Sequence, residues 1–519
     1  MTFTDRSIDA LKAYLRTAAV IDDAAPVPQT TESDPVPQTT ESDPATTALQ
    51  APGRVGQASQ QAEEPAEFKS APLNVPALVD AFLEQDILCT VFGRKEVLTD
   101  NIDALLRSDI LVVDWKLNDD GSRTAQFISS CATGHPNALH MICVYTSEND
   151  LGAIEQKLRN LSPNLKKIQN IPRAYSIGST YVLIVQKTVE EAELPGRLLD
   201  AFAPLVGGLL RNAVFHSIGA IRNNTHALLD RFHPDLDPAF VTHRVYSKPC
   251  EDTEQHLLPL ISSEISSILA QEGIPQHLNS EAIQCWLDSG SRRNEGSGIP
   301  QEIKNIINEK RTDILQKGIM SIQEIKNNPE VKRILKESLL TAFWGAKDGT
   351  KSDAMLAILM ACEHRYSAVE PMLKSGTILK LKDDKKYFLC IQPPCDCVRI
   401  ESEGRPFIFA HVSRCKKKDK FNFTVINQDG TITYLAKDSK AYKASLIKFK
   451  PDSGKTYISA KADSGKLLFT DVDNNKYEFI FQLNELHALR TIQECSNNLS
   501  RIGLMESDWQ RRCTMGEHQ

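Results

Sequence analysis

The sequence lacks both a membrane-spanning stretch and a secretory leader. No apolar run approaches the ~20 residues that cross a bilayer, and the mean hydropathy is −0.30. The chain opens MTFTDRSIDALKAYLRTAAVIDD, without a basic segment followed by an apolar one, so no signal peptide is expected. We therefore expect a cytoplasmic protein.

Dense cysteine patterns and nucleotide-binding motifs are also missing. The 12 cysteines are spread over 519 residues, which favours free thiols in a reducing compartment over a disulfide framework. We find no P-loop, no Gly-rich ATP-lid motif and nothing that resembles a nuclease or a nucleotide cyclase. The last 300 residues give no support for a separate catalytic domain.

The charge is unevenly distributed along the chain. The net charge of −7 hides a segment, residues 374–476, with 21 Lys and Arg against 12 Asp and Glu. This segment carries +9 and leaves −16 for the remainder. At ~150 residues per domain, the length allows three or four domains. The pattern predicts a basic module attached to an acidic body.

A tandem duplication interrupts the first domain. The nonapeptide PVPQTTESD occurs at residues 26–34 and again at residues 35–43. Pro, Thr, Ser, Gln and Glu dominate as far as residue 72, and such a composition offers little apolar surface for a core. We expect residues 26–72 to be a disordered insertion.

Short apolar runs alternate with helical patterns between residues 18 and 187. The predicted strands are residues 18–21, 87–92, 109–113, 139–145 and 181–186; the predicted helices between them are residues 75–85, 95–107, 122–133 and 150–161. Strands that are apolar throughout, separated by helices, indicate a parallel sheet covered on both faces. The sequence therefore predicts a five-stranded α/β domain of the flavodoxin-like type.

The sequence pattern changes twice after this domain. Helical periodicity prevails over residues 195–370, and short β-type runs such as TILKL, FIFAHV and KLLFT follow between Gly, Asp and Asn turns. We predict a first domain at residues 1–194, a helical domain at 195–370, a basic β-rich barrel or sandwich at 371–483, and a C-terminal helix and tail at 484–519.

Polar residues stand where the predicted strands end. Asp22 and Asp23 follow the first strand, Asp114 the third, Thr146 and Ser147 the fourth, and Lys187 the fifth. Each residue type alone also occurs as a helix cap or a solvent-exposed side chain. Because the carboxyl ends of parallel strands meet at one edge, the set together predicts a site.

The strings AVIDD, ILVVDWKLNDDG, MICVYTSE and YVLIVQK closely resemble the receiver domain of two-component response regulators, over about residues 11–187. The resemblance implies that Asp114 accepts a phosphoryl group from a partner histidine kinase. It implies Mg²⁺ as cofactor, held by Asp22, Asp23, Asp114 and the Lys116 carbonyl, with phosphate contacts from Thr146, Ser147 and Lys187.

Some features depart from that family. The insertion separates Asp23 from its helix, the interval between Thr146 and Lys187 is stretched, and Thr188 stands where receivers usually have proline. No aromatic residue lies just before Lys187, although receivers usually carry a Tyr or Phe switch on that strand. We expect phosphorylation to be retained more readily than the usual signalling.

More loosely, IRNNTHALLDRFHP and LSRIGLMESDWQRR resemble large divergent receiver proteins, including those of Detocs-type anti-phage systems. This resemblance implies a protein that accepts and drains phosphate beside a second response regulator that carries the effector.

Three other groups are candidate sites with simpler structural explanations. His216, His226 and His233 could bind a metal or accept phosphate, but single helical histidines are usually solvated or packed. Cys390, Cys395, Cys397 and Cys415 lack the C-x2-C spacing of zinc sites and fit strand positions. Nucleic acid could bind the basic run Arg414, Lys416, Lys417 and Lys418, although such runs are often solvated turns.

The leading prediction is therefore a receiver protein phosphorylated on Asp114, at most an autocatalytic enzyme. The alternative is a nucleic-acid-binding regulator whose degenerate receiver serves for docking or dimerisation.

Overall fold

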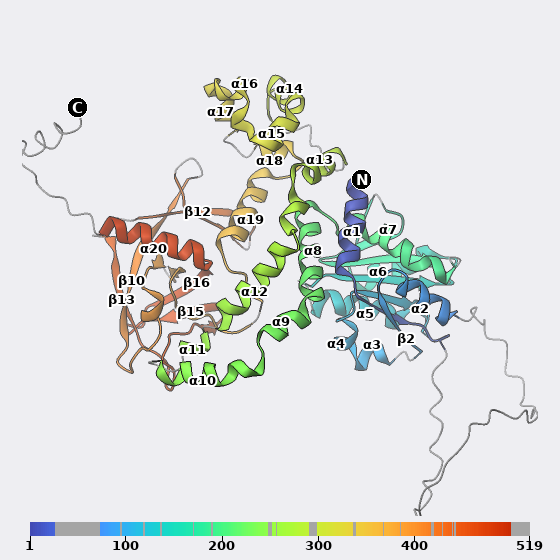
Figure 1. The fold of residues 1–519 in the computed structure, drawn as a ribbon, viewed down its shortest axis with the longest axis horizontal. Coiled ribbons are helices and arrows are strands. Elements are labelled where there is room, and N and C mark those ends of the chain that lie inside the picture. Colours follow the sequence, from blue (N-terminus) through green and yellow to red (C-terminus); the bar gives the residue numbers. More distant parts are fainter. Residues whose placement is uncertain are drawn as a thin grey trace, which may run out of the picture. The chain divides into compact units, whose positions relative to one another are not determined.

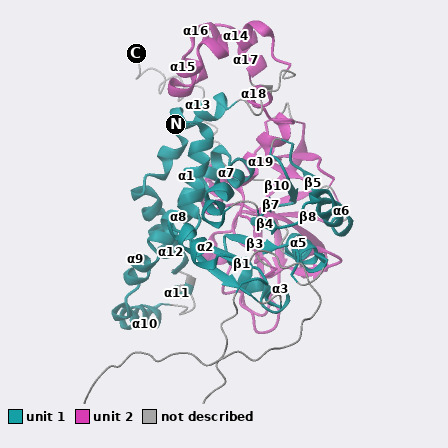
Figure 2. Cartoon of the chain, turned by 90° about the vertical axis from the view of Figure 1, so that its right-hand side faces the viewer, with its two compact units in different colours: residues 1–290 teal, residues 291–519 magenta. Residues whose placement is uncertain are grey.

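The protein is described here from a computed structural model. The described residues are 1–25, 73–93, 96–117, 120–134, 138–169, 171–187, 190–247, 252–255, 257–289, 298–335, 339–366, 368–382, 384, 386–416, 420–427, 429–438, 440 and 443–499. The predicted insertion at residues 26–72 lies outside them. The chain divides into two compact units, residues 1–290 and 291–519, which are coloured separately in Figure 2 and described separately below.

Unit 1 contains a seven-stranded sheet, so the prediction of five strands is wrong. The strand order is β2-β1-β3-β4-β7-β6-β5. Five strands are parallel and correspond to the five predicted apolar runs: β1 (Thr17–Ile21), β2 (Leu88–Phe92), β3 (Ile110–Asp114), β4 (His140–Thr146) and β7 (Thr180–Gln186).

The additional strands form an antiparallel extension in the stretched interval before Lys187. β5 (Lys166–Lys167) pairs with β6 (Ala174–Ile177), and β6 pairs with β7. Ile177 faces Thr180 in the ladder, so two residues make the turn, and Gly178 adopts φ 59° there. Such a turn requires positive φ, which glycine adopts without strain. This hairpin accounts for the two extra strands.

Helices cover both faces of the sheet, as the apolar strands predict (Figure 1). Val20, Val112 and Cys143 belong to one buried cluster, whereas the next residues along the same strands, Ile21, Val113 and Val144, belong to a second. The helices of this region are α1 (Phe3–Tyr14), α2 (Val75–Leu83), α3 (Val97–Asp100), α4 (Ile102–Leu105), α5 (Ser122–Gly134), α6 (Leu151–Leu161), α7 (Leu194–Val206) and α8 (Leu209–Asn223). The helix predicted at residues 95–107 is instead two single turns.

The N-terminal helix α1 is a further addition to the predicted elements. Thr2 and Asp5 form a capping box that starts it. α8 approaches it so closely that a Cβ at Gly219 would lie 2.2 Å from the Ala13 carbonyl oxygen. The Tyr14 and Phe215 rings pack at the same contact, 5.0 Å apart. α8 is therefore fixed to the sheet domain through α1.

The remaining helices of unit 1 continue from α8. They are α9 (Thr225–Arg231), α10 (Asp237–Tyr246), α11 (Asp252–Gln255), α12 (Leu257–Gln271), the 3-10 turn η3 (Ile274–Leu278) and α13 (Ser280–Asp288).

Unit 2 begins with a cluster of short helices. They are α14 (Gln301–Glu309), α15 (Arg311–Lys317), α16 (Gln323–Lys326), α17 (Pro329–Leu335), α18 (Leu339–Phe343) and α19 (Gly349–Ala361). Ile303, Ile307 and Ile325 are buried in their shared core.

A nine-stranded sheet follows, with antiparallel pairing throughout. Its strands, and the helix after them, are β8 (Thr377–Leu381), β9 (Tyr387–Cys390), β10 (Arg405–Cys415), β11 (Phe423–Ile426), β12 (Ile432–Lys437), β13 (Ser445–Phe449), β14 (Lys461–Asp463), β15 (Lys466–Thr470), β16 (Lys476–Gln482) and α20 (Glu485–Leu499).

The sheet of unit 2 curls into a half-barrel, because a bridge between Phe449 and Asp471 joins β13 to the chain after β15. Phe407, Phe409 and Phe449 belong to one buried cluster of this sheet, and a second cluster contains Ala488 and Cys495 of α20. The structure confirms an all-β module in one curled sheet rather than a two-sheet sandwich. Two predicted strands, CVRIE and TYISA, are irregular.

Candidate functional site

Three predicted acidic residues meet at the carboxyl edge of the unit 1 sheet. Asp22 follows β1 directly, and Asp114 is the last residue of the neighbouring parallel strand β3. Carboxylate oxygens of Asp22, Asp23 and Asp114 all lie within 4.8 Å of one another. Asp22 and Asp114 are buried and Asp23 is partly exposed. Strand order thus brings Asp114 beside Asp22 and Asp23, which precede it by 92 and 91 positions in the sequence.

Lys187 completes this group from β7. Its Nζ lies 2.8 Å from Asp22 Oδ2 and 3.3 Å from Asp114 Oδ1. The lysine is held by its backbone, because Lys187 N donates to the Thr146 carbonyl oxygen at 2.7 Å. Burial alone would lower the pKa of Lys187, but the charges of Asp114 and Asp22 outweigh it and hold that pKa above its usual value. The ammonium therefore stays charged among the carboxylates.

The Asp114 carboxyl has an unusual electrostatic setting. Burial raises its pKa to about 7; Lys187 opposes that rise, and the charges of Asp22 and Asp23 add to it. Burial, with the charges of the two neighbouring acids, thus outweighs the effect of Lys187 on this carboxyl. Carboxylate oxygens are the ligands that Mg²⁺ prefers, so a divalent cation fits both the donor set and the missing positive charge.

Thr146 and Ser147 differ in burial. Thr146 is 1% exposed at the end of β4, and its Oγ1 accepts a hydrogen bond from Glu148 N at 3.1 Å. The hydroxyl therefore has a fixed acceptor side and a proton that it can donate to another oxygen. Ser147 follows in an exposed position.

An ion pair beside the acidic cluster was not predicted. Lys116 Nζ lies 2.6 Å from Glu148 Oε1, with side chains 53% and 34% exposed. Lys116 stands two residues after Asp114, and Glu148 stands two residues after Thr146. The sequence could have predicted this pair, because a positive and a negative residue each stand two positions after the end of two adjacent strands. The Lys116 side chain is therefore held in an ion pair, and this leaves its backbone carbonyl as the group expected to bind the metal.

The histidine candidates do not come together. His216 stacks on His277 of η3, with ring centroids 3.6 Å apart, whereas His226 and His233 are exposed. Among the described residues, Asp22, Asp23 and Asp114 form the only group of three His, Cys, Asp or Glu side chains that could hold a metal.

Among the described residues, the four cysteine candidates also form no metal site. Cys390 and Cys397 are buried in the core of the β module, Cys415 is partly buried and Cys395 is exposed. None of the four is in a disulfide. Cys390 and Cys415 lie in strands β9 and β10, as the sequence favours, whereas Cys395 and Cys397 lie in and directly after a 3-10 turn at residues 394–396.

The basic run in unit 2 is partly engaged within the fold. Arg414 donates to the Tyr387 hydroxyl and lies over that ring, 5.7 Å from its centroid. Lys416 is partnered as well, and Lys417 and Lys418 lie outside the described residues. Several other lysines of the module pair with acids: Lys461 with Asp452, Lys466 with Glu478 and Lys476 with Asp463.

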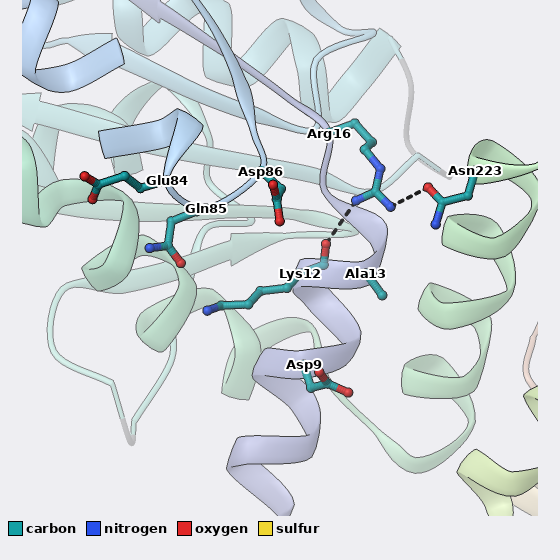
Figure 3. Close-up of a pocket in the computed structure, with 8 residues that line it drawn as sticks. All are labelled: Asp9, Lys12, Ala13, Arg16, Glu84, Gln85, Asp86 and Asn223. Atoms are coloured by element: carbon teal, nitrogen blue, oxygen red, sulfur yellow. Dashed lines mark hydrogen bonds between the residues drawn. The ribbon is translucent and has the colours of Figure 1, made fainter. Parts of the chain in front are cut away.

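A cavity of about 490 Å³ lies elsewhere in unit 1, beside α1, the end of α2 and α8 (Figure 3). Lys12 and Arg16 face Glu84 and Asp86 around it, so its charges are mixed. The Arg16 guanidinium already donates to the Lys12 carbonyl and to Asn223 Oδ1. Reactive side chains do not converge in this polar cavity as they do in the acidic cluster.

Comparison with known proteins agrees with the geometry at the acidic cluster. The family described as the response receiver domain matches residues 14–192, a range that contains β1, β3, β4 and β7 and the residues at their ends. No curated protein and no solved structure matches the chain at a significant level. Among the described residues, no helix is both long enough and apolar enough to cross a membrane.

Proposed function

We propose that this chain, whose residues 14–192 match the response receiver domain family, accepts a phosphoryl group on Asp114 from a phosphohistidine of a partner histidine kinase. The observation that carries the proposal is the convergence of Asp22, Asp23, Asp114 and Lys187 from three different strands. A buried aspartate with an excess of acidic neighbours is poised to react once a cation and a phosphoryl group arrive.

In the proposed reaction, an Asp114 carboxylate oxygen attacks the phosphorus atom. The new P–O bond forms while the P–N bond of the phosphohistidine breaks, and the released imidazole takes up a proton. Asp114 must be deprotonated to attack. Lys187 favours that carboxylate form, since it lies 3.3 Å away as a retained positive charge.

Phosphoryl transfer depends mainly on alignment and charge neutralisation. Asp22, Asp23 and Asp114, with the Lys116 carbonyl, would hold Mg²⁺, which supplies positive charge to the phosphoryl oxygens. Lys187 would move its ammonium from Asp22 toward a phosphoryl oxygen, and the Thr146 hydroxyl would donate to another. Ser147, the exposed residue that follows Thr146, would be a further phosphate contact.

We further propose that the aspartyl phosphate stores or drains phosphate, as in an anti-phage pathway with a second response regulator that carries the effector. The strand before Lys187 supports this, because Ile184, three residues earlier, is a buried aliphatic residue that cannot rotate between two hydrogen-bonded positions. The alternative of a nucleic-acid-binding regulator has less support, because several lysines of the basic module pair with acids of the same module.

The test of phosphoryl acceptance uses the full chain with a small phosphodonor such as acetyl phosphate. We expect intact mass to show one added phosphoryl group with Mg²⁺ and none with EDTA or in Asp114→Asn. Asp120→Asn is the matched control, because Asp120 lies in the same region but pairs with Lys157 at the surface. Uptake that persists in Asp114→Asn, or that ignores EDTA, would refute the assignment.

Storage and signalling are separated by hydrogen exchange on the free and phosphorylated chains. If phosphate is stored, protection should change around β3, β4 and β7 and stay unchanged across residues 198–232 and the β-rich module, because a ligand shifts only states for which it has different affinities. Broad changes in those distant segments would refute storage while leaving phosphorylation intact.

A further inference from the structure

Two cysteines of unit 2 meet in the core of the β-rich module. Cys390 is the last residue of β9, where it pairs with Phe409 of β10. Cys397 directly follows the 3-10 turn η5 (Pro394–Asp396) and belongs to the same buried cluster as Cys390. Both residues are at most 1% exposed, and their thiols hydrogen-bond to each other. We refer to Cys390 and Cys397 as the thiol pair.

The residues just before β8 contact both members of the thiol pair. Gly376 N donates to the Cys390 carbonyl oxygen at 2.9 Å, and Ser375 Oγ lies 4.0 Å from Cys397 Sγ. The Cys397 thiol also donates to the Pro393 carbonyl oxygen at 3.4 Å. Contacts from two separate segments thus keep the two cysteines together, and every group involved lies within unit 2.

Cys397 differs from the other described cysteines whose pKa is shifted. Burial raises the pKa of each of the others: Cys89, Cys131, Cys143, Cys362, Cys390 and Cys495. In Cys397, the hydrogen bond from Cys390, together with that from Ser375, outweighs burial and lowers the pKa. The thiolate is the nucleophilic form of cysteine. Cys397 is therefore the more nucleophilic member of the thiol pair.

We propose that the thiol pair is a redox site, which hydroperoxides convert into a reversible disulfide between Cys390 and Cys397. The Cys397 thiolate attacks a peroxide oxygen, so an S–O bond forms while the O–O bond breaks, and the departing alkoxide or hydroxide takes up a proton. The Cys390 sulfur then attacks the resulting sulfenic acid and expels its hydroxyl group, which leaves as water with the Cys390 proton. The two sulfur atoms lose two electrons, and the peroxide gains them.

The turn η5 gives the oxidant a route to Cys397. Asp396 N donates to the Pro393 carbonyl oxygen and Cys397 N to the Pro394 carbonyl oxygen, so these backbone hydrogen bonds of the turn are local. Such a segment opens at a lower free energy than the strands of a core. Cys390, by contrast, is held in the ladder between β9 and β10. Brief opening of the turn therefore presents Cys397 first, and its closing returns the sulfenic acid to Cys390.

Peptide mapping of the full chain tests the proposal, because trypsin leaves the thiol pair in one peptide, residues 387–399, together with Cys395. The folded chain is treated with hydrogen peroxide, alkylated in urea and digested. We expect a peptide that has lost two hydrogen atoms to the disulfide and carries one alkyl group, on Cys395. Dithiothreitol before alkylation should restore alkylation of all three cysteines. Full alkylation after peroxide, or a single alkyl group on Cys390 or Cys397, would overturn the proposal.

Cysteine variants separate the roles of the two thiols. In Cys390→Ser, the hydroxyl can still donate to Cys397 but cannot close the disulfide, so we expect a Cys397 sulfenic acid that dimedone labels. Cys395→Ser is the matched control at the turn and should leave the disulfide intact; its loss there would contradict the pairing.

The wild type alone keeps the test decisive if a variant misfolds. Peroxide applied in urea should give mixed pairings, because the unfolded chain no longer brings the thiol pair together. The same single product in urea would show that the peptide sequence, and not the fold, selects the pair, and would overturn the proposal. Asp114→Asn should be oxidised as the wild type is, so failure of the proposed phosphorylation would leave this result unaffected.

Discussion

Arg222 of α8 donates to both carboxylate oxygens of Asp109, each at 2.9 Å. The Asp109 side chain is 3% exposed and also accepts from the backbone N–H groups of Arg16 and Thr17. Asp109 immediately precedes β3, the strand that ends with Asp114. The pair thus fastens α8 to the start of the strand whose far end carries the proposed phosphoacceptor.

Removing this pair should destabilise unit 1. Arg222→Ala leaves a buried carboxylate without its cation, and we expect a loss of about 2–3 kcal/mol, at the low end for such pairs because Arg222 is itself 35% exposed. Urea denaturation followed by circular dichroism measures the loss. Arg197→Ala removes an exposed pair with Glu193 and should cost less than about 1 kcal/mol. Equal effects of the two variants would contradict a special role for Arg222.

The Lys116–Glu148 pair should slow hydrolysis of the aspartyl phosphate. The two side chains join the segments after β3 and β4, and we expect this link to restrict the approach of water to Asp114. We expect Glu148→Ala to shorten the half-life of the phosphorylated chain several-fold, as measured by loss of the added mass after the phosphodonor is removed. Arg159→Ala breaks a surface pair with Glu155 on α6 and should leave the half-life unchanged.

The stacked His216 and His277 should make unit 1 less stable in acid. Burial lowers the pKa of both rings. His277 lowers the pKa of His216 further, Arg6 lowers the pKa of His277 further, and Asp9 opposes the shift of both. The folded unit then binds fewer protons than the unfolded chain, so stability is complete above the usual histidine pKa of 6.5 and is lost as pH falls through the lowered folded values.

The corresponding measurement is the midpoint temperature of thermal unfolding, recorded at several pH values between 7.5 and 5. His277→Gln removes one titrating ring and should flatten the decline over this interval. The other charged groups facing the pair are Asp9 and Arg6 of α1 and Glu281 of α13, which share a cavity of about 360 Å³ with it. A decline of unchanged steepness in the variant would assign the acid sensitivity to groups other than this pair.

The segment at residues 26–72 should be dispensable for phosphorylation. Its flanking residues, Ala25 and Leu73, are buried in the same core cluster, and we expect that a Gly-Ser linker can join them. Replacing residues 26–72 by a Gly-Ser linker should change the free energy of unfolding by about 2 kcal/mol or less, because loop-closure entropy varies slowly with length. Urea denaturation and phosphoryl uptake check this expectation, which a failure to fold would contradict.

The parallel strands and their polar ends could be predicted from the sequence for a physical reason. Strands buried on both faces must be apolar throughout, so the runs LVV, MICVY and YVLIV stand out, and the polar residues that follow each run mark the sheet edge. Asp114 and Lys187 were found in this way. Their close approach to Asp22 depends only on strand order, which short crossover connections restrict strongly.

Other features could not be read from the same pattern. β5 consists of two lysines, which show neither apolar character nor alternation, and β6 depends on its pairing with β7 rather than on its own composition. Arg222 and Asp109 are 113 positions apart, and no periodicity in the sequence indicates that α8 packs beside the start of β3. The helix expected at residues 95–107 breaks at Asn101, where the backbone leaves the helical region with φ −126°.

The two edges of the unit 1 sheet differ in their resistance to aggregation. β5 ends one edge with the exposed Lys166 and Lys167, and repulsion between like charges there opposes strand addition from another molecule. The opposite edge, β2, has the uncharged sequence LCTVF and exposes Leu88 by 68%. Sheet-to-sheet association in concentrated solution should therefore start at β2, and Leu88→Lys would improve solubility without touching the acidic cluster.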